Sequence, residues 1–129
     1  MVDQQDLRRL ALLEEFAAAW NRHDVNALMS AMTDDCVFKS TAGPTASGAV
    51  YEGRDAVRAA FAGVWQAFPD AQWNGPTHFV ASDRAVSEWV FTGTRLDGTR
   101  VEAEGCDIFT FRGDKIAVKN SYRKTVSIK

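Results

Sequence analysis

The chain has 129 residues, of which 46% are hydrophobic and 25% charged, with a formal net charge of −2. These values are typical of a globular protein, and the length favours one domain over residues 1–129. The absence of a basic stripe argues against nucleic-acid binding. The absence of a long apolar run or a signal-peptide core indicates a cytoplasmic protein without membrane contact.

Helical spacing of large apolar residues predicts the first elements. A helix is expected over residues 6–22, where leucines and aromatic residues recur every three to four positions. Asp24 is expected to cap a short helix over residues 25–32. A strand follows over 34–40. The small, polar and glycine-rich residues 40–50 indicate a loop or a mobile flap.

A third helix is predicted over residues 54–68, because Val57, Phe61 and Phe68 form an apolar stripe and Pro69 ends the pattern. The remaining chain has the alternation typical of β-structure. Two strands are expected within residues 77–95, around a turn at Ser82 and Asp83. A hairpin turn through Asp97 and Gly98 leads to strands over 100–111 and 116–128. Helices followed by antiparallel strands predict an α+β fold with the helices on one sheet face.

Asp107 is the unusual residue of the strand over 100–111. Counting by twos places it on the face that also carries Ala103, Phe109 and Phe111. Ionising an acid in apolar surroundings is costly unless a partner compensates the charge. The pattern therefore marks Asp107 as a candidate functional residue.

The chain resembles the nuclear transport factor 2-like superfamily in four stretches, EEFAAAWNRHDVNALMSAMTDDCVF, YEGRDAVRAAFAGVWQAFPD, VSEWVFTGTRLDG and GCDIFTFRGDKIAVKNSYRK. This superfamily includes ketosteroid isomerases, scytalone dehydratase, limonene epoxide hydrolase and SnoaL-like polyketide cyclases. The resemblance implies a cone-shaped α+β fold, in which N-terminal helices pack on a curved antiparallel sheet and enclose a pocket. Because one scaffold hosts several activities, it does not imply one reaction.

Three positions of the ketosteroid isomerase branch can be compared with this chain. The sheet aspartic acid of its oxyanion hole corresponds to Asp107. Its helix tyrosine corresponds to Phe16, which has no hydroxyl, and its proton-shuttling aspartate corresponds to Ser40. Losing one oxyanion donor typically costs about a hundredfold or more in rate. We therefore expect no 3-oxosteroid isomerase activity.

The resemblance also implies further cavity residues. It turns Thr92 toward the cavity with Glu88 nearer its mouth, and it directs Lys119 and Arg123 inward from the last strand. It implies a homodimer through the convex sheet face, which Trp89 and Phe91 would line. Cavity walls are expected from aromatic residues: Phe16, Trp20, Phe61, Trp65 and Phe109.

The charges of this cavity suggest acid–base chemistry on a small, partly apolar and anionic molecule. A neighbouring Lys119 favours the ionised form of Asp107, whereas burial alone favours the neutral acid. In the leading hypothesis Asp107 or Glu88 accepts a proton, and Lys119 or Arg123 stabilises developing negative charge. Isomerisation, cyclisation, dehydration and epoxide hydrolysis all fit this scheme. With two histidines and no metal-ligand spacing at Cys36 or Cys106, no metal and no cofactor are expected.

Simpler interpretations stay open at this point. Asp107 and Lys119 could form a structural ion pair, or a different strand phase could place Asp107 at the surface. Lys119 and Arg123 could hold a ligand carboxylate or phosphate, and Glu88 could be a solvated edge residue. The alternative to an enzyme is a non-catalytic ligand-binding or dimeric accessory domain. Pure protein–protein association is favoured if side chains fill the pocket.

Overall fold

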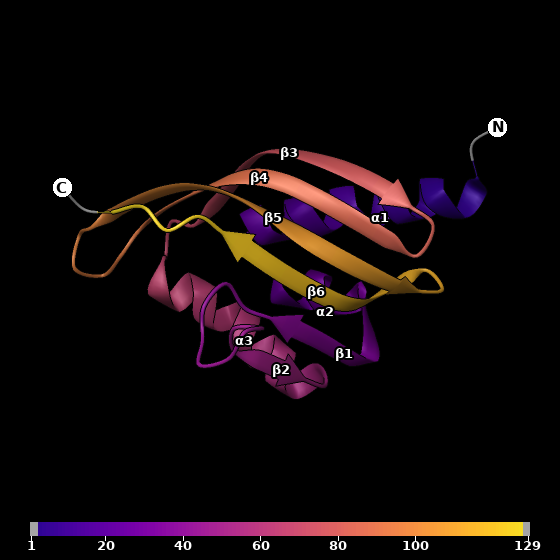
Figure 1. The fold of residues 1–129 in the computed structure, drawn as a ribbon, viewed down its shortest axis with the longest axis horizontal. Coiled ribbons are helices and arrows are strands. Elements are labelled where there is room, and N and C mark those ends of the chain that lie inside the picture. The colour runs from indigo at the N-terminus through magenta and orange to yellow at the C-terminus, as the bar shows by residue number, and fades with distance from the viewer. Residues whose placement is uncertain (1–2, 128–129) are drawn as a thin grey trace.

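The structure, a computed structural model, describes residues 3–127. Its helices and strands follow in the order α1 (Gln4–Asn21), α2 (Val25–Ser30), β1 (Met32–Lys39), β2 (Val50–Glu52), α3 (Arg54–Ala67), β3 (Gln72–Ala81), β4 (Arg84–Thr94), β5 (Arg100–Arg112) and β6 (Lys115–Arg123). The fold is an α+β cone: a curved, unclosed sheet carries the helices on its concave side (Figure 1).

The six strands form one sheet in the order β2-β1-β6-β5-β4-β3. All neighbours are antiparallel except β1 and β6, which run parallel. Helix α1 packs against β3, and α3 packs against β1 and β2. The long central strands β4, β5 and β6 therefore present one face to the helices and the other outward, as Figure 1 shows.

Most elements predicted from the sequence are confirmed. Asp24 caps α2 by accepting a hydrogen bond from the Ala27 amide at 3.1 Å, and α3 ends at Ala67 before Pro69. The differences concern the strands. The short strand β2 was not predicted, and β3 begins at Gln72 instead of residue 77. Strand β6 ends at Arg123, so residues 124–127 extend no strand. The last predicted strand residue, Ile128, lies outside the described residues. Within the described chain, no helix combines the length and apolarity that a membrane crossing needs.

The loop between β1 and β2 folds back on itself. The Ser40 amide donates to the Ala49 carbonyl at 2.9 Å, and the Ala49 amide donates to the Ala42 carbonyl at 3.0 Å. A Cβ atom on Gly43 would lie 2.0 Å from the Ala49 nitrogen, so the close approach of the two chain segments requires glycine there. The loop is exposed, and its action as a lid stays a prediction.

The core lies between the helices and the concave sheet face. Its largest fully buried side chains are Phe61, Phe91, Phe109, Leu13, Leu28, Ile116 and Val57. Phe61 is central, with its ring 4.9 Å from Trp20, 5.0 Å from Phe38 and 6.3 Å from Phe16. The aromatic side chains of the predicted apolar helix faces therefore pack against one another and against the concave face of the sheet.

Arg9 is a buried cation that fixes α1 to two hairpin turns. Its guanidinium donates to the Ser82 carbonyl at 2.7 Å and to the Gly113 carbonyl at 2.9 and 3.1 Å. It also lies 5.1 Å from the centre of the Phe111 ring. Because carbonyl oxygens receive all three of these hydrogen bonds, the fixed backbone of both turns compensates the desolvated charge.

Arg9→Ala is expected to lower the free energy of unfolding by about 1.5–3 kcal/mol, because it leaves buried carbonyl groups without a charged donor. Urea denaturation measures this change. Arg8→Ala is the matched control, since the neighbouring Arg8 contacts Asp114 with both side chains more than half exposed. It should change stability by no more than about 0.5 kcal/mol. Equal effects of the two variants would contradict the anchoring role of Arg9.

Candidate functional site

Four polar residues form a row across the concave face of the sheet. His78 on β3 pairs with Ser87 on β4, Ser87 pairs with Asp107 on β5, and Asp107 pairs with Ser121 on β6. Directly opposed residues of antiparallel strands point to the same face. The register therefore gathers these four side chains on the helix side of the sheet, where apolar residues otherwise predominate.

Asp107 and Lys119 form a buried ion pair, and each residue is only 6% exposed. The Lys119 ammonium donates to Asp107 Oδ1 at 3.0 Å and to Ser121 Oγ at 2.7 Å. The Ser121 hydroxyl also donates to Oδ1, at 2.5 Å. Oδ1 of Asp107 therefore accepts hydrogen bonds from a cation and from a hydroxyl. The predicted pairing of Asp107 with Lys119 is thus present, and the predicted strand phase of Asp107 is confirmed.

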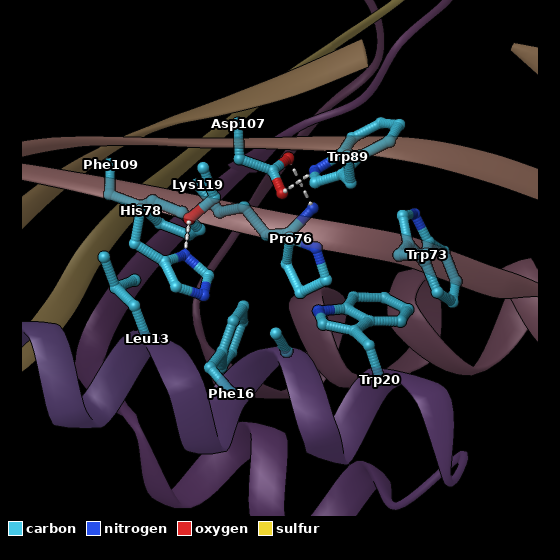
Figure 2. A pocket seen from close by; sticks show the side chains of 12 residues that line it. Leu13, Phe16, Trp20, Trp73, Pro76, His78, Trp89, Asp107, Phe109 and Lys119 are labelled. Carbon is cyan, nitrogen blue, oxygen red and sulfur yellow. Dashed lines mark hydrogen bonds and ion pairs between the residues drawn. The ribbon is translucent and has the colours of Figure 1, made fainter. Parts of the chain in front are cut away.

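Trp89 completes the shell of donors around Asp107. Its indole N–H donates to Asp107 Oδ2 at 3.0 Å (Figure 2). Trp89 pairs with Gly105 across the strands, and a Cβ on Gly105 would lie 2.5 Å from the indole ring. Glycine at position 105 therefore leaves the space through which the indole reaches Asp107.

An aromatic cage surrounds the Lys119 ammonium. The nitrogen lies 4.8 Å from the centre of the Phe38 ring, 5.1 Å from that of Trp20 and 5.9 Å from that of Phe61. Ring faces attract cations, and more strongly where water is excluded. The charge of Lys119 is thus compensated by Asp107 on one side and by aromatic faces on the other.

The ion pair lies on the wall of a small cavity between α1 and strands β3 to β6. Figure 2 shows its lining, which includes Phe16, Trp20 and Phe109 among the predicted wall residues. The cavity volume is about 20 Å³, room for roughly one water molecule. The indole N–H of Trp20 is buried there and has no hydrogen-bond partner among residues 3–127. The cavity therefore offers an unused donor close to a fixed positive charge.

His78 belongs to the same cavity, although no pattern in the sequence selected it as a site residue. Its Nδ1 lies 2.6 Å from the hydroxyl of Ser87, a residue that is 4% exposed. Burial lowers the pKa of His78 below its ordinary value, while the charges of Glu14 and Asp107 oppose this shift. The pairing of β3 with β4 changes register between Asn74 and Thr77, directly before His78. Such β-bulges often redirect side chains at functional sites.

Two predicted cavity residues, Glu88 and Thr92, lie on the opposite face of the sheet. Glu88 is exposed and lines an outer hollow with Glu104, and Thr92 accepts a hydrogen bond from the Asn74 amide. The expectation drawn from the resemblance is therefore wrong at both positions. The β4–β5 hairpin has a three-residue loop, in which the Arg95 amide donates to the Thr99 carbonyl at 2.8 Å, and its register pairs Ser87 instead of Glu88 with Asp107. A two-residue turn through Asp97 and Gly98 would pair Glu88 with Asp107. One added residue moves every side chain of the strand to the other face.

The same one-residue difference in register places Trp89 and Phe91 on the opposite sheet face from the one expected. Both are buried on the concave side, so they cannot line a dimer surface on the convex side. The homodimer itself stays a prediction. With the observed register, the prediction of a dimer through the outer face depends on four apolar residues there, which are half-buried or exposed: Val86, Ile108, Val118 and Tyr122.

Ser40 and Arg123 lie in a second hollow, beside α3, with a volume of about 660 Å³. Arg123 is half-buried, and its guanidinium lies 4.7 Å from the centre of the Phe91 ring. Burial lowers the pKa of Arg123, and the charge of Arg95 adds to the effect. Phe38 lines this hollow, and the centre of its ring lies 4.8 Å from the Lys119 ammonium. Trp65 packs on Trp20 with ring centres 5.3 Å apart. The predicted site residues are thus divided between two spaces.

The remaining reactive side chains do not form a nucleophilic or metal site. Both cysteines are free thiols, and burial raises the pKa of Cys36 and of Cys106, which disfavours the reactive thiolate. Between residues 3 and 127, no three His, Cys, Asp or Glu side chains converge as metal ligands would.

The curved sheet, the helices on its concave face and the polar cluster between them define a protein with the nuclear transport factor 2-like fold. A family model of the SnoaL-like domain matches residues 13–119. The chain therefore belongs to the SnoaL-like domain family. A comparison with curated proteins found no match.

Solved structures share this fold at low sequence identity. A candidate polyketide cyclase from Xanthomonas campestris pv. campestris has a TM-score of 0.81 at 18% identity, with 92% of each chain covered. An NTF2-like protein of unknown function from Mesorhizobium loti has a TM-score of 0.79 at 23% identity, covering 97% of this chain and 98% of its own. A candidate isomerase from Bacillus subtilis has a TM-score of 0.79 at 16% identity, covering 95% and 90%. At such identities the likeness shows the fold alone.

Proposed function

We propose that this SnoaL-like protein is a cofactor-independent acid–base enzyme that acts on a small, partly apolar molecule. Isomerisation, cyclisation, dehydration and epoxide hydrolysis share the step that the cavity can assist, which is proton transfer coupled to charge development on an oxygen. The observation that carries the proposal is the buried Asp107–Lys119 pair on the wall of an aromatic cavity. The names of the related candidate cyclase and isomerase agree with this class of reaction.

Two donors of the cavity can stabilise a developing oxyanion. The Lys119 ammonium uses two donor positions on Asp107 and Ser121 and retains a third. The Trp20 indole N–H has no acceptor within the described residues. A preorganised donor acts more strongly in a site that excludes water, since no solvent must reorganise during the reaction. Both Asp107 oxygens already accept hydrogen bonds from Lys119, Ser121 or Trp89. Phe16 supplies no hydroxyl, which argues against 3-oxosteroid isomerisation.

A substrate must move side chains before it can enter, because the cavity holds only about one water molecule. The exposed Pro76 lies on the lining at the edge strand β3 (Figure 2), where the pairing of β3 with β4 is irregular between Asn74 and Thr77. The proposed entrance is therefore between α1 and β3.

The test uses cyclopentanone as a small, partly apolar probe, and NMR follows exchange of its α-protons in heavy water. Wild-type protein is expected to accelerate exchange over buffer, and Lys119→Met should reduce the acceleration by about a hundredfold or more. Lys124→Met is the matched control, because Lys124 is exposed and pairs only at the surface with Glu104. Circular dichroism verifies that each variant is folded. No acceleration by wild type, or full acceleration by Lys119→Met, would contradict the proposed enzyme.

A second candidate is a non-catalytic ligand-binding or dimeric accessory domain. The small volume of the ion-pair cavity favours it, since side chains nearly fill that space. A ligand would then occupy the larger hollow beside α3, where Arg123 suits a carboxylate or phosphate. Saturable binding of an apolar carboxylate that requires Arg123, without any proton exchange by the protein, would favour this second candidate.

A further inference from the structure

His78 is the titratable side chain of the cavity that the Asp107–Lys119 pair leaves unused. The other candidate for proton transfer, Asp107, already accepts hydrogen bonds from Lys119 and Ser121 at Oδ1 and from Trp89 at Oδ2. A proton added to Asp107 would cancel the charge that compensates the buried Lys119 ammonium. Uncompensated buried charge is costly. Asp107 is therefore a poor proton acceptor while Lys119 remains protonated beside it.

The imidazole of His78 has the opposite arrangement. Its Nδ1 is held by the buried Ser87 hydroxyl, while no residue from 3 to 127 forms a hydrogen bond with Nε2. Figure 2 shows Nε2 on the side of the ring away from Ser87, toward α1 and the cavity lining. A ring that is fixed through one nitrogen and free at the other is prepared for proton exchange at the free nitrogen.

The protonation state of His78 fits this use. Burial disfavours the imidazolium and lowers the pKa of His78, so the neutral form predominates at pH 7. The charged groups that face the ring are Glu14 on α1 and Asp107 on β5, and both oppose the shift. The carboxylates would therefore stabilise the imidazolium once a substrate proton has been transferred to it.

We propose that Nε2 of His78 is the proton-transferring group of this cavity, and that Asp107 is a positioning residue that holds Lys119. This inference rests on the proposed acid–base function and names the residues that carry out its steps. A substrate C–H proton moves to Nε2, the C–H electron pair forms a carbon–carbon double bond, and the carbonyl π pair moves onto oxygen. Lys119 and the Trp20 N–H stabilise that oxyanion. The imidazolium then returns its proton to carbon or to a leaving oxygen, which restores the neutral ring.

The first test measures the ring itself, without a substrate. Nitrogen-detected NMR of the histidine ring is expected to show a neutral His78 at pH 7, protonated at Nδ1 toward Ser87 and titrating below about 6.5. Ser87→Ala should abolish the fixed tautomer. A ring protonated at Nε2, or one titrating at 6.5 or above, would overturn the assignment whatever the activity.

The second test measures cyclopentanone exchange as a function of pH. With His78 as acceptor, the rate should fall about tenfold per pH unit below the titration of the ring, whereas a carboxylate acceptor would keep it level to about pH 4. His78→Gln should lose about a hundredfold or more. His23→Gln is the matched control, since His23 bonds the Ala71 carbonyl at the far end of α1.

The outcomes separate the two proposals. Exchange that is lost in Lys119→Met but retained in His78→Gln would overturn the role of His78 and leave the enzyme proposal standing. Exchange absent from the wild-type protein would overturn both. Loss in His78→Gln together with the acid-side fall in rate supports both.

Discussion

Replacing Asp107 with asparagine is expected to lower the free energy of unfolding by about 3–5 kcal/mol, because it leaves the Lys119 ammonium buried without its counter-charge. Both residues are only 6% exposed, so water cannot compensate the loss. Lys119→Met should be similarly harmful, since it leaves the carboxylate without its cation. Urea denaturation of the single variants and of the Asp107→Asn, Lys119→Met double variant measures the coupling.

The double variant should cost clearly less than the sum of the two single variants, because it leaves no unpaired charge. The exposed pair of Lys124 and Glu104 is the matched control, with side chains 75% and 71% exposed. Its removal should change stability by less than about 1 kcal/mol. Additive losses at the Asp107–Lys119 pair would show that the two charges do not depend on each other.

Phe61→Ala is the second large effect expected, with a loss of about 3–5 kcal/mol in the free energy of unfolding. The ring is fully buried and contacts the rings of Phe16, Trp20 and Phe38. Its removal opens a cavity beside the cage around Lys119, so packing and cation–π attraction are lost together. Thermal and urea unfolding of the variant measure the change.

Phe79→Ala is the matched control, because the same side chain is 56% exposed on the edge strand β3. It is expected to change stability by no more than about 0.5 kcal/mol. A loss below about 1 kcal/mol for Phe61→Ala would mean that the core closes over the missing ring, contrary to the rigid packing inferred for the cage.

The elements of the chain were largely predictable because they depend on local patterns. The apolar stripe of α3 and the capping role of Asp24 depend only on residues within one or two helical turns of each other. The concave position of Asp107 follows from the alternation of its own strand. The matches of the SnoaL-like domain agree with the fold that these patterns and the resemblance indicated.

The face of β4 was not predictable in the same way. Both of its faces carry apolar residues, Val86 and Val90 on one and Trp89 and Phe91 on the other. Only the register with β5 distinguishes them, and that register depends on a single residue in the Arg95–Thr99 loop. The resemblance had assigned Glu88 and Thr92 to the cavity and Trp89 to the convex face, and the observed register shows that these assignments are wrong.

The sequence alone therefore determined the order of the elements and the apolar face on which Asp107 lies. The resemblance turned Lys119 toward the cavity but left open whether it pairs with Asp107. The tertiary structure decided which other side chains reach that carboxylate. It placed Trp89, Ser87 and His78 around one cavity, bonded the Ser121 hydroxyl to Asp107, and placed Ser40 and Arg123 in another hollow. The physical reason is that periodicity fixes a face within one strand, whereas a site across four strands depends on every register and loop length between them.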